Sequence, residues 1–167
     1  MLSREDIRIM VRRMAYQVFE KFGTFERMVI LGVNGEGLPL ARLLKAELDA
    51  MGGLASEVYT LNLEKHQARR PAVTFSPPLP DLDGMPVLLV DDVLNSGRTL
   101  TYALAPLMEF SIPCLHIAVL VERTYRTFPV SATITGLALS TTLEEHVVTR
   151  IEGPDETAGV FLTDDLG

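Results

Sequence analysis

The chain has 167 residues, of which 47% are hydrophobic, and its formal net charge is −7 at pH 7. This length suits one domain with a substantial buried core. The acidic balance argues against nucleic-acid binding, whose affinity comes mainly from lysine and arginine against phosphates. No apolar run reaches the roughly 18 residues that a membrane-spanning helix needs.

The first half of the chain alternates helical patterns with short apolar runs. Ser3 is a predicted N-cap, and the acids just after it suit the positive end of a helix dipole. The predicted elements are a helix from Ser3 to Gly23, a strand over Met28–Val33, a helix over Leu38–Met51 closed by Gly52 and Gly53, and a strand over Glu57–Leu63. The residues expected to face the core are Ile7, Met10, Val11, Met14, Val18 and Phe22 on the first helix and Leu40, Leu43, Leu44 and Leu48 on the second.

The second half begins with a polar, proline-rich stretch over residues 64–83, for which we expect a long connection without structure of its own that is functional or mobile. A strand over Val87–Asp91, a helix over Arg98–Phe110 that kinks or ends early at Pro106, and a strand over Leu115–Val121 follow. Three shorter strands, Ala132–Leu137, His146–Ile151 and Gly159–Leu162, either extend the sheet edge or build a small cap, and residues 163–167 are expected to fray.

This alternation of strands and helices predicts an α/β fold. We expect a single domain over residues 1–167 with a mostly parallel central sheet flanked by helices, plus a small edge or hood element. The only cysteine, Cys114, excludes an internal disulfide bond and is expected to be a small buried residue rather than a nucleophile. A reduced cysteine and a charged segment at residues 1–6 without a signal-peptide core predict a cytoplasmic protein.

Residues Val87–Thr99 carry the main functional signal. Four apolar residues lead into Asp91 and Asp92, and a loop of small polar residues then precedes a helix. Open α/β sheets bind ligands at the carboxyl ends of their strands, and the N–H groups at a helix start bind anions. A phosphorylated ribose would place its phosphate at Ser96–Thr99 and its diol at the two acids. Gly97 suits such a loop because it lets the backbone approach a phosphate without a Cβ.

This segment resembles the phosphoribosyl pyrophosphate (PRPP) binding motif of type I phosphoribosyltransferases, with no break across the motif. The resemblance implies that Asp91 and Asp92 hold the ribose, directly or through water on a Mg²⁺ cofactor. It also implies that the 5′-phosphate lies among Asn95, Ser96, Gly97, Arg98 and Thr99. Arg98 either adds positive charge there or is a solvated surface side chain.

Three further stretches, residues 32–41, 118–126 and 128–130, resemble PyrR-type pyrimidine-operon regulators and uracil phosphoribosyltransferases. The resemblance implies a pentosyltransferase that joins a pyrimidine base, such as uracil, to ribose 5-phosphate with release of pyrophosphate. It also implies a homodimer. PyrR-type regulators bind messenger RNA through a basic face, which we expect to be absent in so acidic a chain.

The chain departs from this family in the loop that follows the Met28–Val33 strand. The loop that grips pyrophosphate in the family corresponds to Asn34, Gly35, Glu36 and Gly37, and the family normally has a basic residue where Glu36 stands. A carboxylate there repels pyrophosphate unless Mg²⁺ bridges the two. Glu36 therefore weakens PRPP binding or indicates a ligand without pyrophosphate, or is bridged by Mg²⁺, or points into solvent while the N–H groups of Gly35 and Gly37 bind.

A second departure lies in the mobile loop that closes over the active site in the family. Here Lys65, Arg69 and Arg70 are the candidates for stabilising the departing pyrophosphate. His66 is more simply a solvated side chain than an acid or base. On the base side, the resemblance points to Glu122, Arg123 and Tyr125 after the Leu115–Val121 strand, although the first two also suit a plain ion pair.

Three functions are compatible with these residues. The first is an active phosphoribosyltransferase that uses PRPP and a nucleobase, and we favour it because every ribose- and phosphate-side residue is present. The second is a catalytically weak or inactive regulatory protein that binds PRPP or a nucleoside monophosphate, which Glu36 favours. The third is an interaction protein with a vestigial site, against which the intact Val87–Thr99 motif argues.

Overall fold

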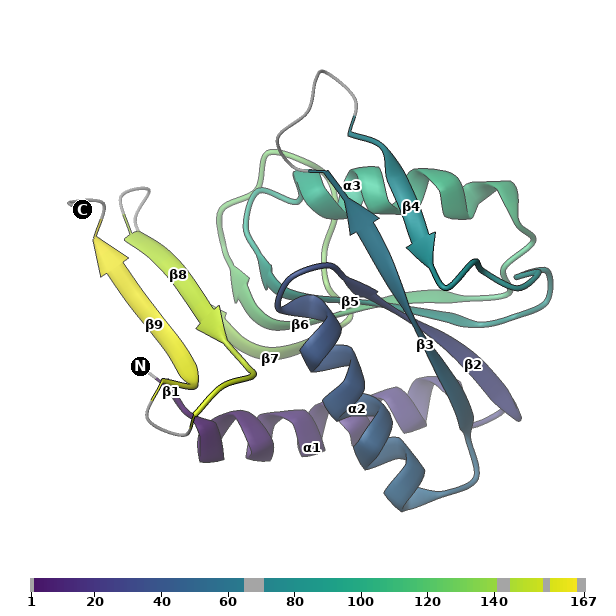
Figure 1. Cartoon of the computed structure of the whole chain (residues 1–167), viewed down its shortest axis with the longest axis horizontal. Helices are drawn as coiled ribbons and strands as arrows, with labels where there is room; N and C mark the ends of the chain where they lie inside the picture. The colour runs from purple at the N-terminus through teal and green to yellow at the C-terminus, as the bar shows by residue number, and fades with distance from the viewer. Residues whose placement is uncertain (1, 65–70, 141–144, 155–156, 165–167) are drawn as a thin grey trace.

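A computed structural model describes residues 2–64, 71–140, 145–154 and 157–164. Within these residues the main sheet has six strands in the order β4-β3-β2-β5-β6-β7, and all neighbours are parallel except β4 and β3. Figure 1 shows how this sheet crosses the molecule. Its strands are β2 (Arg27–Val33), β3 (Ala55–Leu63), β4 (Val73–Ser76), β5 (Val87–Leu94), β6 (Leu115–Arg123) and β7 (Ile134–Leu139).

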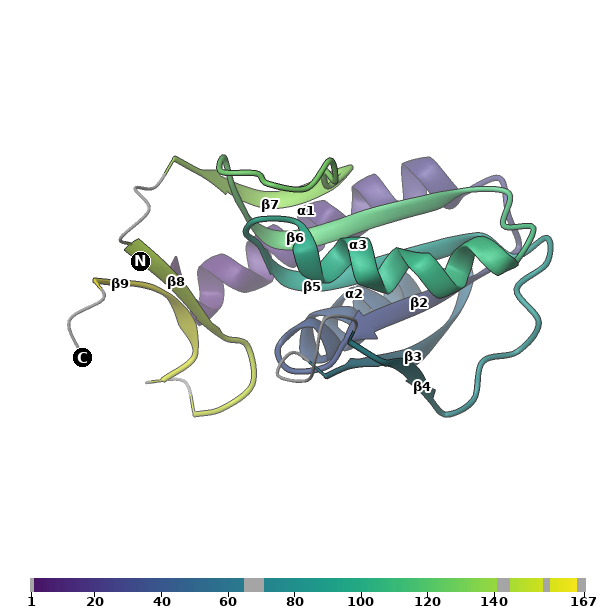
Figure 2. The same ribbon diagram turned by 90° about the horizontal axis from the view of Figure 1, so that it is seen from above.

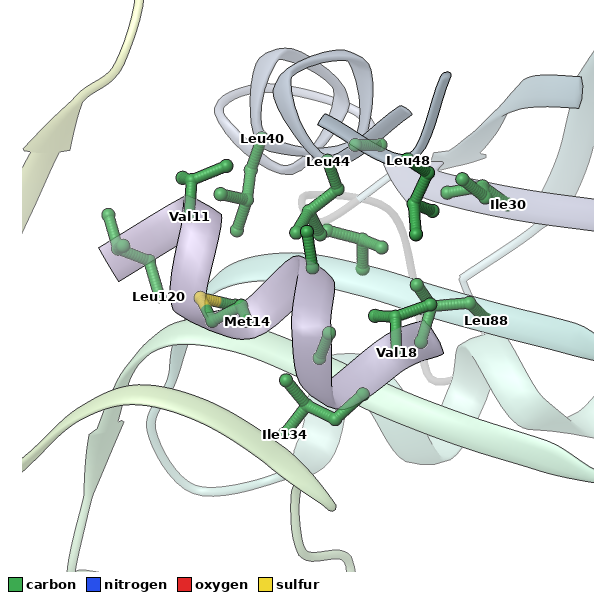
Figure 3. Packing of buried hydrophobic residues seen from close by; sticks show 14 of the residues in the cluster. Val11, Met14, Val18, Ile30, Leu40, Leu44, Leu48, Leu88, Leu120 and Ile134 are labelled. Carbon is green, nitrogen blue, oxygen red and sulfur yellow. The ribbon is translucent and has the colours of Figure 1, made fainter. Parts of the chain in front are cut away.

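Helices cover both faces of this sheet. Figure 2, seen from above, shows α3 (Arg98–Leu104) in front of the strands, with α1 (Arg4–Phe22) and α2 (Gly37–Met51) behind them. The larger apolar cluster joins α1 and α2 to the sheet, and its side chains interdigitate as Figure 3 shows for Met14, Leu44 and Leu88. A second cluster lies beneath α3. The α/β fold with a mostly parallel sheet is therefore confirmed.

The ends of the first two helices follow from their sequence. Ser3 caps α1 in a reciprocal capping box with Asp6, and Gly23 ends the helix as predicted. Gly52 ends α2 at φ 73°, a left-handed conformation that glycine adopts without strain. The α1 stripe is buried as expected except for the half-buried Met10. The expectation for Leu43 is wrong, because it lies on the outer face of α2 and is 36% exposed.

The three short C-terminal strands divide between the two expected roles. The strand β7 extends the main sheet in parallel, whereas β8 (Glu145–Arg150) and β9 (Gly159–Asp164) pair with β1 (Leu2–Ser3) in a separate antiparallel sheet. This small sheet, β1-β9-β8, lies beside the main one at the left of Figure 1. The strand β1 was not predicted, because two residues are too short to show a period.

Several boundaries differ from the predictions. Residues 64–83 are not without structure, since β4 pairs antiparallel with β3 there. The β5 strand runs three residues beyond Asp91. The helix after the motif ends at Leu104 and continues as a 3₁₀ segment over Ala105–Glu109, the early end expected at Pro106. Within the described part of the chain, no helix is both long enough and apolar enough to cross a membrane.

Cys114 lies just before β6 and is half-buried rather than fully buried. It packs against the larger apolar cluster, and burial raises the pKa of its thiol above the ordinary value. A thiol with a raised pKa forms less of the reactive thiolate near neutral pH. The expected packing role is therefore supported by its surroundings.

Candidate active site

The candidate site lies where the carboxyl ends of the parallel strands meet. Asp91 and Asp92 lie near the end of β5, and the strands β2 and β6 flank it on either side. Asp91 is only 4% exposed, whereas Asp92 is half-buried. Asp91 Oδ1 accepts the Asp92 N–H at 2.9 Å. Two adjacent carboxylates are thus held at the edge where open α/β sheets bind ligands.

The loop after β5 turns sharply into α3. Gly97 precedes the helix at φ 85°, in the left-handed region. A Cβ on Gly97 would lie 3.3 Å from the Phe128 carbonyl oxygen, so both its conformation and its surroundings favour glycine. The Ser96 carbonyl accepts the N–H groups of Thr127 and Phe128, which fixes the loop against the segment after β6. At the start of α3, the Arg98 N–H donates to Ser96 Oγ at 3.4 Å.

Arg126 joins the two loops, a role that was not predicted from the sequence. Its guanidinium donates to the carbonyl oxygens of Asn95 at 2.7 Å and Val130 at 3.1 Å, among others. It also forms a 2.5 Å ion pair with Glu122, and both side chains are only 22% exposed. The five donors of one arginine thus hold the phosphate-side loop and the base-side loop in one arrangement. The four-residue spacing of Glu122 and Arg126 was the available signal.

A cavity of about 170 Å³ is lined by the ten residues 91–100 and by Val147 of β8. Every residue expected on the ribose and phosphate side therefore lines one space. The small sheet contributes one wall, which the sequence did not predict. The volume is below the roughly 300–1,000 Å³ of sites that enclose whole drug-sized ligands, and it suits the phosphate end of a nucleotide.

The residues expected on the base side separate in the structure. Glu122 and Arg123 line a second cavity of about 520 Å³. Arg123 is 8% exposed and donates to Asn95 Oδ1 at 3.1 Å, which joins this cavity to the phosphate-side loop. The Glu122 carboxylate forms its ion pair with Arg126 and accepts from the Thr135 hydroxyl. Tyr125 is 47% exposed and lines neither cavity.

The loop expected to bind pyrophosphate is largely committed to the fold. Asn34 joins the ends of two strands, because its N–H donates to the Leu61 carbonyl and its Oδ1 accepts the Leu63 N–H. A Cβ at Gly37 would lie 2.9 Å from the Val90 carbonyl oxygen, so glycine lets α2 begin directly against β5. Gly35 has φ 94° and open space around it. Only Gly35 is exposed in this loop.

Glu36 contacts the small sheet instead of pointing into solvent. Its Oε2 accepts the Ile151 N–H at 2.6 Å, across 115 positions of sequence. Of the alternatives for Glu36, the one in which its side chain points into solvent does not agree with this contact. Thr149, two residues earlier, donates its hydroxyl to Asp92 Oδ2. Nothing local in the sequence identifies Thr149 or Ile151 as partners of these acids.

Lys65, His66, Arg69 and Arg70 lie outside the described residues. Among the residues that the structure describes, no cluster of three or more His, Cys, Asp or Glu side chains is placed to hold a metal ion. Mg²⁺ commonly binds through one or two carboxylates together with substrate phosphates, and does not require such a cluster. Asp91 and Asp92 at the cavity therefore fit a Mg²⁺ ion that arrives with its phosphorylated ligand.

The acid pair and the cavity at the β5–α3 turn lie where the resemblance to phosphoribosyltransferases placed a ligand. Residues 2–151 match the phosphoribosyl transferase domain family, so the chain belongs to this family and is a pentosyltransferase-type glycosyltransferase. It is 33% identical over 169 residues to a Microcystis aeruginosa protein named Bifunctional protein PyrR, covering 96% of this chain and 94% of that one. A protein of the same name from Gloeothece citriformis is 36% identical over 162 residues, covering 92% and 90%.

Solved structures show the same fold at much lower sequence identity. The hypoxanthine phosphoribosyltransferase of Trypanosoma cruzi superposes with a TM-score of 0.80 at 15% identity, covering 98% of this chain and 95% of that one. The low identity limits this likeness to the fold. Among phosphoribosyltransferases, the chain is therefore PyrR-like in sequence.

Proposed function

We propose that this chain transfers the 5-phosphoribosyl group of PRPP to a pyrimidine base, with uracil as the first candidate. The observation that carries the proposal is the single cavity lined by both acids and the whole loop 95–99. The name of the 33–36% identical relatives supports a pyrimidine over other bases.

In this reaction a ring nitrogen of the base attacks the anomeric carbon of the ribose. The bond from that carbon to pyrophosphate breaks, the new carbon–nitrogen bond forms, and the ring nitrogen loses its proton. The transition state has oxocarbenium character, so the protein acts mainly by positioning and by stabilising charge. Bound Mg²⁺ would neutralise charge on the departing pyrophosphate.

The residues of the site divide this work. Asp91 and Asp92 hold the ribose hydroxyls or the metal ion, and the loop 95–99 holds the 5′-phosphate. Binding energy at the phosphate, remote from the reacting carbon, orients that carbon for attack. The base lies in the adjoining cavity, near the Arg123 guanidinium that Asn95 fixes. Lys65, Arg69 and Arg70 remain our candidates for the pyrophosphate.

A second candidate function, a slow or inactive nucleotide-binding regulator, is favoured by one observation. The pyrophosphate-side loop uses Asn34 and Glu36 for contacts within the chain, so less of it is available to the leaving group. This candidate predicts saturable nucleotide binding without pyrophosphate release. A regulatory role through RNA is not part of it, since we expect no basic face on a chain of net charge −7. The homodimer and the cytoplasmic location stay predictions.

Calorimetric titration with PRPP and Mg²⁺, and with uridine monophosphate, tests the proposal. Binding of both ligands, followed by pyrophosphate release with uracil, is the expected result. Nucleotide binding without turnover with any base would favour the regulator. Failure of both ligands to bind would contradict both functions.

A further inference from the structure

Two acids at the candidate site reach across to the end of β8, where Thr149 lies in the strand and Ile151 directly follows it. Glu36 Oε2 accepts the Ile151 N–H at 2.6 Å, and Asp92 Oδ2 accepts the Thr149 hydroxyl. Ile151 is 4% and Thr149 is 7% exposed, whereas Glu36 and Asp92 are half-buried, so both contacts are partly shielded from solvent. Hydrogen bonds to charged acceptors are stronger than neutral ones, especially where water is excluded.

Thr149, which contacts Asp92, shares one face of β8 with Val147. Side chains alternate across a strand, so Val147 and Thr149 point the same way. Their burial agrees, since His146, Val148 and Arg150 are exposed while Val147 is half-buried and Thr149 is buried. Val147 is also the one residue of the small sheet that lines the phosphate-side cavity. The contacts at residues 149 and 151 therefore set where the cavity wall lies.

Two other polar contacts join the segment after β8 to the helices, and both are longer and more exposed. Arg42 and Glu152 form an ion pair at 3.8 Å with side chains 61% and 63% exposed. The Arg4 guanidinium donates to the Gly153 carbonyl at 3.4 Å. Exposed ion pairs contribute little to stability. The Glu36 contact is thus the shorter and drier attachment.

We propose that Glu36 is a positioning residue, which fastens β8 so that Val147 closes the nucleotide cavity. In this role the carboxylate acts as a hydrogen-bond acceptor and not as a charge toward pyrophosphate. The proposal rests on the proposed function in one respect only, namely that the cavity closed by Val147 binds a phosphorylated ribose.

Two substitutions separate the acceptor role from the charge. Glu36→Gln removes the charge but keeps a side-chain oxygen that accepts the Ile151 N–H. Glu36→Ala removes both. Repulsion of pyrophosphate would make both variants bind PRPP more tightly, whereas positioning makes only the alanine variant differ from wild type. Glu152→Ala is the matched control, because it removes an exposed carboxylate from the residue that follows Ile151.

Hydrogen exchange over residues 147–151, without ligand, measures the attachment of β8 directly. We expect exchange at Ile151 to rise about tenfold in Glu36→Ala and to change less than threefold in Glu36→Gln and Glu152→Ala. Calorimetry with uridine monophosphate should show a five- to tenfold weaker affinity for Glu36→Ala alone. A cavity wall that is no longer held in place explains both changes.

Tighter PRPP binding by Glu36→Gln, with exchange unchanged, would overturn the proposal, and this result does not require the alanine variant to fold. Equal exchange in all four proteins would also overturn it. If wild type binds neither PRPP nor uridine monophosphate but exchange changes as expected, the proposed function fails while the positioning of β8 by Glu36 stands.

Discussion

The two loops of the candidate site are held in opposite ways. The phosphate-side loop, residues 95–99, is fixed from outside, because Arg126 and the segment at Thr127–Phe128 bond to its backbone carbonyls. The pyrophosphate-side loop, residues 34–37, is fixed by its own side chains, since Asn34 and Glu36 accept N–H groups from β3 and from Ile151. The first loop is held mainly through its carbonyl groups, with one side-chain contact between Asn95 and Arg123, whereas the second loop uses two side chains for the fold.

This difference shows why a family motif predicts one loop better than the other. In a loop held mainly through its backbone, most side chains are not needed for the fold. A family motif in such a loop therefore predicts ligand contacts. A loop held through side chains can exchange a ligand contact for a structural one. The position of Glu36 in the family motif predicted a role at pyrophosphate and not its hydrogen bond with Ile151.

Removing Arg126, which holds the loop 95–99 from outside, should have the largest effect on stability. Arg126→Ala leaves the Glu122 carboxylate and several carbonyl oxygens without their donor in a half-buried place. We expect a loss of about 2–4 kcal/mol in the free energy of unfolding, measured by urea denaturation. Arg126→Lys should recover little, because an ammonium lacks the planar fork. Arg8→Ala, at an exposed ion pair, is the control, and an equal loss there would contradict this account.

Removing a charge from the ligand-facing region should act on binding instead. Asp91→Asn keeps an oxygen that accepts the Asp92 N–H but weakens the bonds to ribose hydroxyls. The affinity for uridine monophosphate should fall about 10- to 100-fold, which corresponds to about 1.4–2.7 kcal/mol. Calorimetry on this variant and on Asp49→Asn, whose carboxylate pairs with Lys45 on the surface of α2, makes the test. An unchanged affinity would remove Asp91 from the ribose site.

Alanine substitution of one glycine in each loop tests directly how tightly the two loops are packed. Gly97 and Gly35 both have positive φ, but a Cβ on Gly97 meets Phe128 and Val130 whereas one on Gly35 meets nothing within 4 Å. Alanine should cost about 1–2 kcal/mol of backbone strain at either position. Gly97→Ala should cost about 1 kcal/mol more, because packing must also shift. Equal losses in thermal or urea unfolding would show that the outside support of loop 95–99 is adaptable.

The smallest effect is expected at His116, near the opposite end of β6 from the site. Burial, with a smaller contribution from Lys21, lowers the pKa of His116 from its ordinary value of 6.5. Below pH 6.5 the unfolded chain therefore binds a proton that the folded chain does not, and stability falls as the pH falls. Urea unfolding of His116→Gln between pH 7.5 and 5.5 should show a flatter dependence than wild type. A slope as steep as that of wild type would assign the acid sensitivity to other groups.

The elements that the sequence predicted well are those whose signal is local. Apolar spacing predicted α1, and the run Val87–Val90 before two acids predicted β5 with its turn. Both depend on residues that are neighbours in the chain. The phosphate-side residues 95–99 are also neighbours in the chain, which is why the sequence predicted that they share one site. In the structure they line one cavity.

The parts that were missed depend on partners far away in the chain. The strand β4 lies in a proline-rich stretch and exists because β3 offers a free edge. The wall at Val147 and the partner of Glu36 arise from a sheet whose strands come from both ends of the described chain. Arg126 was assigned no role from the sequence, because its carbonyl partners have no side-chain signature.

The pairing of Leu2 with Val160 has a consequence for the order of folding. Closing a loop over nearly the whole chain costs entropy before any contact compensates it, and such long-range pairings form slowly. The main sheet, whose adjacent strands are mostly joined by short crossovers, does not wait for this step. A folding chain should therefore hold Asp91 and Asp92 in place while β8 and its Val147 wall are still absent. Tight nucleotide binding would then be a late event in folding, and a ligand would select those molecules whose two ends have already met.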